Sequence, residues 1–465
     1  MSAETPALAA TAPRELTSVG RWLILAAAFF GWLFAGVQMS LMNLASRAAA
    51  TEFLRSGQLT EGTHFVFDQL IQPAPGLRNQ LSTVDEKRVL KKEAPRCFAW
   101  FNSAFLFGAA TGGFVFGRMG DRFGRAKAMS LSIGCYSALS AVAYLARTPE
   151  QFLLLRFFAG LGVGGMWPTG VSLASEAWPE RHRPMLSGML GTSANVGIVL
   201  ISVAAYFRDV TPDSWRWLLL LGSVSIVLAV LVWIGVPESP RWLAARAAAT
   251  PSTEAWTLPA VFRPPLLKLT LIGIALGTIP LLGGWGVTAW FIPWTDKVME
   301  AVDPRAKAFT AIMRAGGATI GGLLGGWIAN VVGRRLTFFL ISLSSFVMGE
   351  YIYSALTPTD GSFQYWVFAL GGVSTLFFGW LPLYLPELFP TTSRATGSGV
   401  SFNFGRILTA MGVLGTGALT QFYQEDYAAA GRVTTLIYAI GMIVILFAPD
   451  TTKRSALSDQ PSAST

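Results

Sequence analysis

Three arginines and one glutamate stand inside long apolar stretches of this chain: Arg156, Arg314, Glu350 and Arg406. A charged side chain near the centre of a bilayer costs roughly 2.5–3.5 kcal/mol on insertion scales, so such a group normally faces a cavity or an ionic partner. A guanidinium stays protonated in proteins and binds carboxylates through charge-assisted hydrogen bonds, often two at once. Arg406, near the middle of its stretch, is therefore the foremost candidate for binding an anion.

The four charges have different expected roles. For Arg314 and Arg406 the alternative to a cavity is a structural ion pair. Arg156 opens a glycine-rich motif, which favours a structural or gating role. Glu350 lies toward the end of its stretch, so we expect it to reach the membrane surface or to pair locally.

The stretches that hold these residues are long enough to cross a bilayer. The 465-residue chain is 52% hydrophobic and only 13% charged, whereas soluble proteins carry roughly 25% charged residues. A membrane helix needs about 20 predominantly apolar residues. We therefore predict an all-α membrane protein with about twelve transmembrane helices, near residues 21–44, 98–117, 126–146, 150–175, 185–206, 215–236, 267–290, 308–329, 336–356, 364–385, 396–419 and 431–449.

The distribution of Lys and Arg predicts the orientation of these helices. With both termini in the cytoplasm, the cytoplasmic tails and loops hold 17 of the 35 Lys and Arg residues and the short outer loops hold seven. Cytoplasmic loops are the more positive ones in membrane proteins. The net charge of +9 is thus explained by topology, and we expect no nucleic-acid partner. The two cysteines and two histidines predict no disulfide framework, metal site or cofactor.

Two motifs occur twice, in the same order. Residues 117–125 (GRMGDRFGR) and 326–334 (GWIANVVGR) are 209 positions apart. A Glu-x-x-Pro-x-x-x-Arg-x-x-x-Ser-Gly pattern begins at Glu176 and again at Glu387, 211 positions later. Recurrence at nearly one spacing indicates two six-helix halves of parallel topology.

The repeat and the Pro-rich stretches divide the chain into five parts. We expect a cytoplasmic N-terminal tail without a cleaved signal peptide, a first half with a long outer loop, a cytoplasmic connector, a second half and a cytoplasmic tail. Their boundaries are 1–20, 21–236 with the loop at 45–97, 237–266, 267–449 and 450–465.

These motifs resemble those of the major facilitator superfamily over essentially the whole chain outside the 45–97 loop. The run 117–125 is similar to the family's loop between helices two and three. Arg156-x-x-x-Gly160-x-Gly162-x-Gly164-Gly165 looks like its helix-four motif, and the sequence PESPRWL at 237–243 looks like the end of helix six in sugar porters and organic-ion transporters.

The resemblance implies a conformational latch at the cytoplasmic ends of the helices, built from carboxylate and arginine pairs. Within it, Glu238 and Arg241 are expected to tie the halves together, and Asn330 replaces an acid in the second copy, which predicts a weaker second latch. The alternative is that the arginines only set the topology. The latch residues are Gly117, Asp121, Arg125, Arg156, Glu176, Arg183, Glu238, Arg241, Arg334, Glu387 and Arg394.

The resemblance also implies a central cavity between the halves. Pockets combine apolar walls with a few polar groups, so we expect the polar and aromatic residues at mid-span to line it. For each tryptophan, the alternative is lipid contact or packing. The candidate binding residues are Gln38, Asn102, Trp167, Asn195, Trp285, Trp290, Arg314, Trp380, Tyr384, Asn403 and Arg406.

A secondary transporter is the expected function, since no phosphate-binding loop for ATP is present. The stretch GGMWP at 164–168 looks like that of proton-coupled organic-acid, aromatic-acid and sialic-acid carriers, which favours an organic anion and a coupling proton. The D-G-x-D pattern common in those carriers reads Ala35-Gly36-Val37-Gln38 here, without an acid.

The alternatives are a neutral sugar or metabolite as substrate, a non-transporting receptor with the same fold, and a membrane enzyme. The short tail and connector disfavour a receptor. No nucleophile–base pair or metal cluster marks an enzyme. We expect a monomer in the cytoplasmic membrane of a bacterium, with the lipid bilayer and a small-molecule substrate as its partners.

Overall fold

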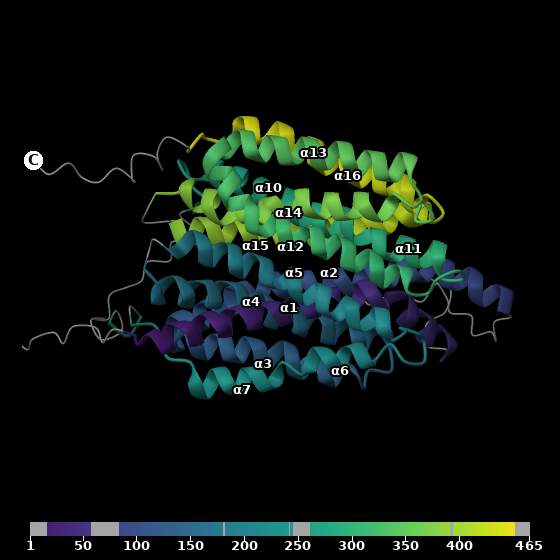
Figure 1. The fold of residues 1–465 in the computed structure, drawn as a ribbon, viewed down its shortest axis with the longest axis horizontal. Coiled ribbons are helices and arrows are strands. Elements are labelled where there is room, and N and C mark those ends of the chain that lie inside the picture. Colours follow the sequence, from purple (N-terminus) through teal and green to yellow (C-terminus); the bar gives the residue numbers. More distant parts are fainter. Residues whose placement is uncertain are drawn as a thin grey trace, which may run out of the picture.

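The computed structural model describes residues 16–56, 83–179, 182–240, 242–244, 261–390 and 394–451. These residues form long helices joined by short loops (Figure 1). The helices are α1 (Ser18–Arg55), α2 (Thr83–Phe123), α3 (Arg125–Ala143), α4 (Pro149–Ala177), α5 (Arg183–Phe207), α6 (Trp217–Ser223), α7 (Ile226–Gly235), α10 (Leu267–Leu282), η3 (Gly283–Val287), η4 (Thr288–Trp290), α11 (Phe291–Met299), α12 (Ala306–Val332), α13 (Arg334–Ala355), α14 (Phe363–Glu387), α15 (Arg394–Phe422) and α16 (Tyr427–Phe447).

These helices make twelve spans, because α6 with α7 is one span and α10 through α11 is another. In the described part of the chain, ten of the spans are long and apolar enough by themselves to cross a membrane. The other two are α3 and α15. In α3 the polar hydroxyl groups are satisfied by neighbouring helices, since Ser130 donates to the backbone oxygen of Ala229 (2.7 Å) and Ser132 to that of Gly162 (2.6 Å). The predicted all-α fold with twelve spans is confirmed.

The two halves lie side by side, with α1–α7 on one side and α10–α16 on the other (Figure 1). Two seams join them. At the first, Thr192 of α5 donates to the backbone oxygen of Thr319 in α12 (2.7 Å). At the second, Ser103 of α2 donates to the backbone oxygen of Ala410 in α15 (2.9 Å). The corresponding helices of each half thus meet the other half, as a parallel repeat requires.

Small residues allow the helices of each half to approach closely. A Cβ atom added to Gly164 of α4 would lie 1.9 Å from the backbone oxygen of Ala109 in α2. In the second half, a Cβ atom on Gly317 of α12 would lie 1.9 Å from the backbone oxygen of Phe368 in α14. Such contacts replace the hydrophobic effect as the source of helix association in lipid.

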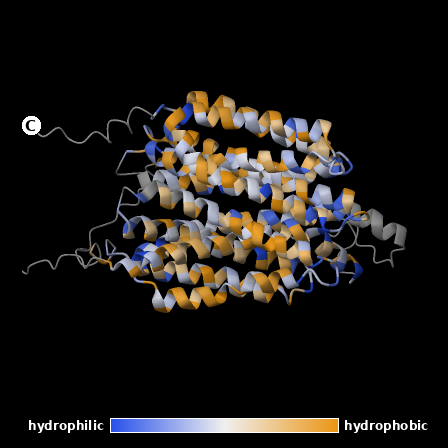
Figure 2. Cartoon of the chain, in the orientation of Figure 1, coloured by the Kyte–Doolittle hydropathy of each residue, from blue (hydrophilic) through white to orange (hydrophobic). Residues whose placement is uncertain are grey.

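Hydrophobic residues predominate along the helices at the edge of the bundle, such as α7 (Figure 2). On α7, Leu231 and Ile234 expose 61% and 78% of their surface. Exposed apolar surface of this extent is suited to contact with lipid tails.

Some segments depart from the predicted spans. α1 continues to Arg55 and α2 begins at Thr83, so both ends of the predicted outer loop are helical. The seventh span is longer than expected and ends at Met299. It is interrupted at 283–287 by a π-helical turn. Residues 57–82 and most of the connector and of both tails lie outside the described residues.

Candidate functional site

A central cavity of about 480 Å³ lies between the two halves. α1, α2, α4 and α5 line it from the first half, and α10, η3, η4, α12, α14 and α15 from the second. Because it is formed by both halves, any relative movement of the halves changes its shape and its access.

The cavity extends to the face of the bundle at which α1 begins and α16 ends, which we call the termini face (on the left in Figure 1). Its lining includes Ser172 near the end of α4, Pro386 near the end of α14 and Ser398 near the start of α15. These helix ends all lie at the termini face. A solute therefore has a route into the cavity from that side.

Ionic contacts join the two halves at the opposite face, which we call the far face. Arg47 of α1 pairs with Glu300, just after α11 (2.7 Å). Lys307 at the start of α12 donates to the backbone oxygen of Val210 (3.4 Å), and Arg305 lies 3.8 Å from Asp209. At the termini face, by contrast, each ion pair among the described residues joins two residues of the same half, and none connects the two halves. The bundle is thus closed at the far face.

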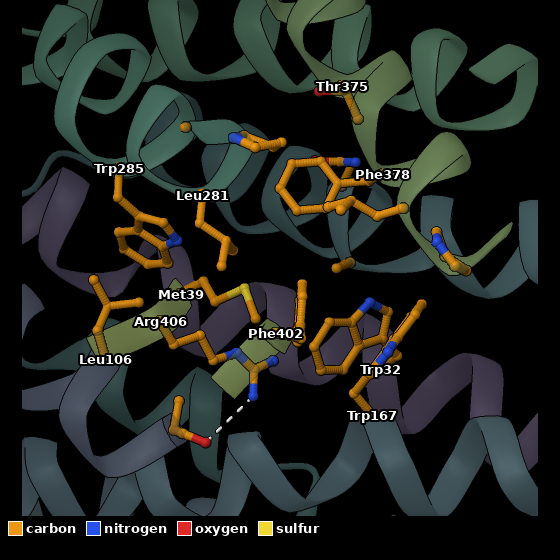
Figure 3. A pocket seen from close by; sticks show the side chains of 18 of the residues that line it. Trp32, Met39, Leu106, Trp167, Leu281, Trp285, Thr375, Phe378, Phe402 and Arg406 are labelled. Atoms are coloured by element: carbon orange, nitrogen blue, oxygen red, sulfur yellow. Dashed lines mark hydrogen bonds between the residues drawn. The ribbon is translucent and has the colours of Figure 1, made fainter. Parts of the chain in front are cut away.

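Arg406 points into the cavity between Trp285 on one side and Trp32 and Trp167 on the other (Figure 3). Its Nη1 atom donates to the backbone oxygen of Ala109 in the other half (3.3 Å) and to Oδ1 of Asn403 (3.5 Å). Both hydrogen bonds are long and therefore weak. No carboxylate among the described residues pairs with Arg406, so its charge is uncompensated.

Arg314 of α12 lines the same cavity. Its Nε atom is buried without a hydrogen-bond partner, and no ion pair to it exists among the described residues. A buried polar group without a partner is costly, and more so when it is charged. The group is thus available to a ligand.

Aromatic rings form much of the remaining wall. The rings of Trp32 and Trp167 lie 5.0 Å apart between their centroids, and those of Phe105 and Trp285 lie 6.2 Å apart. Trp285 sits in η3, the π-helical turn of the seventh span. Such turns are frequent at functional sites because they rotate the following side chains.

Of the candidate binding residues, six line the cavity: Trp167, Asn195, Trp285, Arg314, Asn403 and Arg406. Five do not: Gln38, Asn102, Trp290, Trp380 and Tyr384. The six come from α4, α5, η3, α12 and α15, so the structure brings together side chains from both halves.

Trp380 and Tyr384 lie on the buried face of α14, away from the cavity, and are fully buried. Their rings stack with centroids 4.4 Å apart. Trp380 Nε1 donates to the backbone oxygen of Arg334 (2.7 Å), and the Tyr384 hydroxyl donates to that of Pro449. Satisfied polar groups in a packed cluster hold helices together, so these two residues have a structural role.

Gln38, Asn102 and Arg156 are buried inside the first half. Arg156 donates to the backbone oxygen of Gln38 (3.2 Å), and its guanidinium carbon lies 4.4 Å from the centroid of the Phe105 ring. Gln38 in turn donates to the backbone oxygen of Gly222 (3.0 Å). Arg156 thus supports the cavity wall from behind Phe105 and lies far from the latch cluster in which it was expected.

The first latch cluster is assembled at the termini face. Arg125 pairs with Asp121 and, through Nε, with Glu176 Oε1 (3.4 Å). Glu238 accepts hydrogen bonds from the backbone nitrogens of Arg125 (2.8 Å) and Ala126 (3.2 Å), at the start of α3. A carboxylate there complements the helix dipole. Glu238 therefore ties the connector to the first half, and its described contacts do not reach the second half.

The second latch cluster repeats this arrangement around Arg334. Its Nε and Nη2 atoms donate to the two carboxylate oxygens of Glu387 (3.2 and 3.0 Å), and Nη1 donates to Asn330 Oδ1 (2.6 Å). The side chain of Arg334 is only 5% exposed, against 19% for Arg125. A bidentate pair with a buried arginine gives no structural sign of the weakening expected from Asn330.

The remaining four latch residues are Gly117, Arg183, Arg241 and Arg394, and the structure describes no latch contact of their side chains. A Cβ atom on Gly117 would meet no atom within 4 Å, so close packing does not require glycine there. Arg183 and Arg394 begin α5 and α15 at the termini face, but their side chains lie outside the described part of the structure. Arg241 lies outside it altogether.

Several cavity residues were missed in the sequence. Most are apolar or aromatic, one is an amide, and all lie on helices that contribute other wall residues: Trp32, Met39, Asn43, Phe105, Phe378 and Phe402. Neighbouring wall residues on α2 and α15 recur at helical spacing, such as Phe105 with Ala109 and Phe402 with Arg406. Residues four positions apart lie on the same face of a helix, so a candidate wall residue such as Arg406 predicts a second wall residue at position 402.

A bundle of two similar six-helix halves around a central cavity open to one face is the architecture of a membrane transporter. The chain belongs to the Major Facilitator Superfamily, whose family model matches residues 92–413.

Similar proteins agree with this assignment. The cis,cis-muconate transport protein of Acinetobacter baylyi is 29% identical over 316 residues, covering 66% of this chain and 74% of that protein. The sialic acid transporter NanX of Escherichia coli is 24% identical over 347 residues, covering 74% and 82%. The structure of the xylose transporter XylE from E. coli, in a partially occluded inward-open conformation, matches with a TM-score of 0.68 at 16% identity, covering 93% of this chain and 99% of that chain.

Proposed function

We propose that this protein is a secondary transporter that carries a small organic carboxylate across the membrane by alternating access. One observation carries the proposal. The only charged side chains among the described residues that line the cavity are Arg314 and Arg406. A site with two uncompensated cations and mostly apolar walls favours an anion with an apolar skeleton.

The two halves contribute differently to this site. Both arginines come from the second half, on α12 and α15. The first half contributes Trp32, Phe105 and Trp167. In the proposed binding mode, the carboxylate contacts the second half and the carbon skeleton packs against the rings of the first. The names of the relatives that transport muconate and sialic acid agree with an acidic substrate.

Closure at the far face and opening at the termini face correspond to one of the two states that alternating access requires. We place the termini face in the cytoplasm, because the Lys and Arg residues of the short loops concentrate there. The structure then represents the inward-open state. Because a single chain forms the whole cavity, we propose that it acts as a monomer.

The alternative substrate is a neutral sugar or metabolite, which Asn43, Asn195 and Asn403 in the cavity wall would suit. A thermal-shift panel on the purified protein distinguishes the two, because a bound ligand raises the apparent stability by mass action. Benzoate, cis,cis-muconate and sialic acid represent the acids. Their methyl esters or amides and xylose represent neutral compounds. We expect stabilisation only by compounds with a free carboxylate, and stabilisation by xylose or by the neutral analogues alone would refute the proposal.

A further inference from the structure

The charge of the central cavity is unbalanced. Arg314 and Arg406 line it, and no described lining residue is an Asp, a Glu or a His. The acids elsewhere in the described spans lie outside the cavity; for example, Asp296 pairs with Lys307 at the far face (3.0 Å), and Glu350 lies on α13. The cavity therefore contains two fixed positive charges and no described group that takes up a proton.

This imbalance affects the open and the closed states of the cavity differently. In the open state, the cavity is connected to water at the termini face, which lowers the cost of holding two charges there. When the cavity closes during the transport cycle, that water is displaced, and burying unpaired charges is strongly unfavourable. A bound carboxylate compensates the charge and supplies hydrogen bonds in their place. The loaded carrier can thus close far more easily than the empty one.

Arg406 adds a second link between binding and movement. In this structure its Nη1 atom donates to Ala109, across the seam between α15 and α2. The hydrogen bond joins the two halves at the cavity wall. A carboxylate that binds the guanidinium competes with the hydrogen bond from Arg406 to Ala109. Binding of an anion therefore breaks one of the hydrogen bonds that join the halves in the present arrangement.

We propose that the protein is an anion exchanger, which crosses between its two open states only with a carboxylate bound in each direction. This inference rests on the proposed carboxylate transport and adds the second substrate, a counter-carboxylate from the opposite side. It replaces proton coupling as the expected energy source. A ligand changes a conformational equilibrium only through its different affinity for the two states, and the two uncompensated guanidiniums are what give a carboxylate that difference.

Reconstitution of the full chain into phosphatidylcholine vesicles tests this. Uptake of labelled benzoate, cis,cis-muconate and sialic acid is measured into vesicles loaded either with the same unlabelled acid or with potassium chloride alone, with the membrane potential set to zero. We expect at least tenfold faster uptake into the acid-loaded vesicles, and no acceleration of uptake into chloride-loaded vesicles by an acidic outside medium.

Three outcomes distinguish carboxylate exchange from carboxylate transport without exchange. Equal uptake into both kinds of vesicle, or uptake driven by the pH gradient without an internal acid, overturns exchange but keeps carboxylate transport. No uptake of any acid under either condition refutes carboxylate transport itself, and exchange with it. The ratio of the two uptake rates should fall in Arg314→Gln, which lowers the charge of the cavity. It should not change in Arg263→Gln, since Arg263 is exposed outside the cavity.

Discussion

At the scale of single residues, the two cavity arginines differ in the contacts that hold their guanidinium groups. Arg314 has a buried Nε atom without a partner, whereas Arg406 is held by two long hydrogen bonds and lies against the Phe402 ring, with 4.7 Å from Cζ to the ring centroid. Arg406 is therefore oriented before a ligand arrives. A pre-oriented fork suits bidentate recognition of a carboxylate, which a lysine ammonium cannot reproduce.

Substitution of Arg406 should discriminate between anionic and neutral substrates. Losing a charged partner in a buried site costs roughly 2–5 kcal/mol, so Arg406→Gln should abolish detectable binding of a carboxylate and spare that of a neutral sugar. Arg406→Lys keeps the charge without the fork and should retain part of the affinity. Calorimetric titration of the folded variants gives these affinities.

The exposed Arg263 serves as the matched control, since Arg263→Gln removes the same charge away from the cavity and should bind as wild type does. Near-wild-type carboxylate affinity in Arg406→Gln would show that the guanidinium only links α15 to α2.

At the scale of the helices, the shape of the cavity wall depends on how closely α2 and α4 pack. Gly164 of α4 faces the backbone of Ala109, the residue that accepts the hydrogen bond from Arg406. A methyl group at this position would have to push α2 away. The helix-four motif thus acts on the site through backbone spacing and not through its own chemistry.

The substitution Gly164→Ala should lower stability by about 1–3 kcal/mol, the usual cost of overpacking a tight contact. It should also weaken carboxylate binding, because displacement of α2 moves Phe105 and Ala109. Thermal unfolding in detergent and the thermal-shift panel measure the two effects.

Gly117→Ala provides the comparison, because no atom lies within 4 Å of the added methyl group. Because alanine is the better helix former, we expect its stability to be unchanged or raised by up to about 1 kcal/mol. Equal unfolding temperatures for both alanine variants would contradict the assigned role of the α2–α4 contact.

At the scale of the whole molecule, the ionic contacts between the halves lie at the far face, while each latch cluster at the termini face is intact within its own half. The latch clusters hold helix ends together in each half, and they coexist with a cavity that reaches the termini face. The contacts that stabilise the present state are therefore those of Arg47 with Glu300 and of Arg305 with Asp209.

The double variant Glu300→Gln with Asp209→Asn should shift the population toward the state open at the far face. Exposed ion pairs contribute about 0.2–1 kcal/mol each, so the ratio of the two states should change roughly two- to thirtyfold. Labelling of Ser172→Cys from the termini face reports the shift, in a background with Cys97→Ser and Cys135→Ser. We expect slower labelling in the double variant.

A nearby acid provides the control for this experiment. Asp213 is exposed between α5 and α6 and has no ion pair among the described residues, so Asp213→Asn should leave labelling unchanged. If the double variant also labels at the wild-type rate, the far-face pairs do not control access to the cavity.

The sequence by itself determined the number of spans, the duplication of the halves and the class of the protein. Span length and composition are local properties that the bilayer dictates, and a repeated motif is visible in one dimension. The choice of Arg314 and Arg406 also came from the sequence, because a charge inside an apolar stretch needs a compensating environment.

Only the tertiary structure decided which side chains meet. Trp167 and Trp380 both lie in the second half of their spans, two residues apart in the repeat, yet one lines the cavity and the other is packed behind it. The direction of a side chain depends on the rotation of its helix, which changes by about 100° per residue and is fixed by packing with distant segments. The π-helical turn beneath Trp285 and the uncompensated state of Arg406 likewise depend on neighbours far away in the chain.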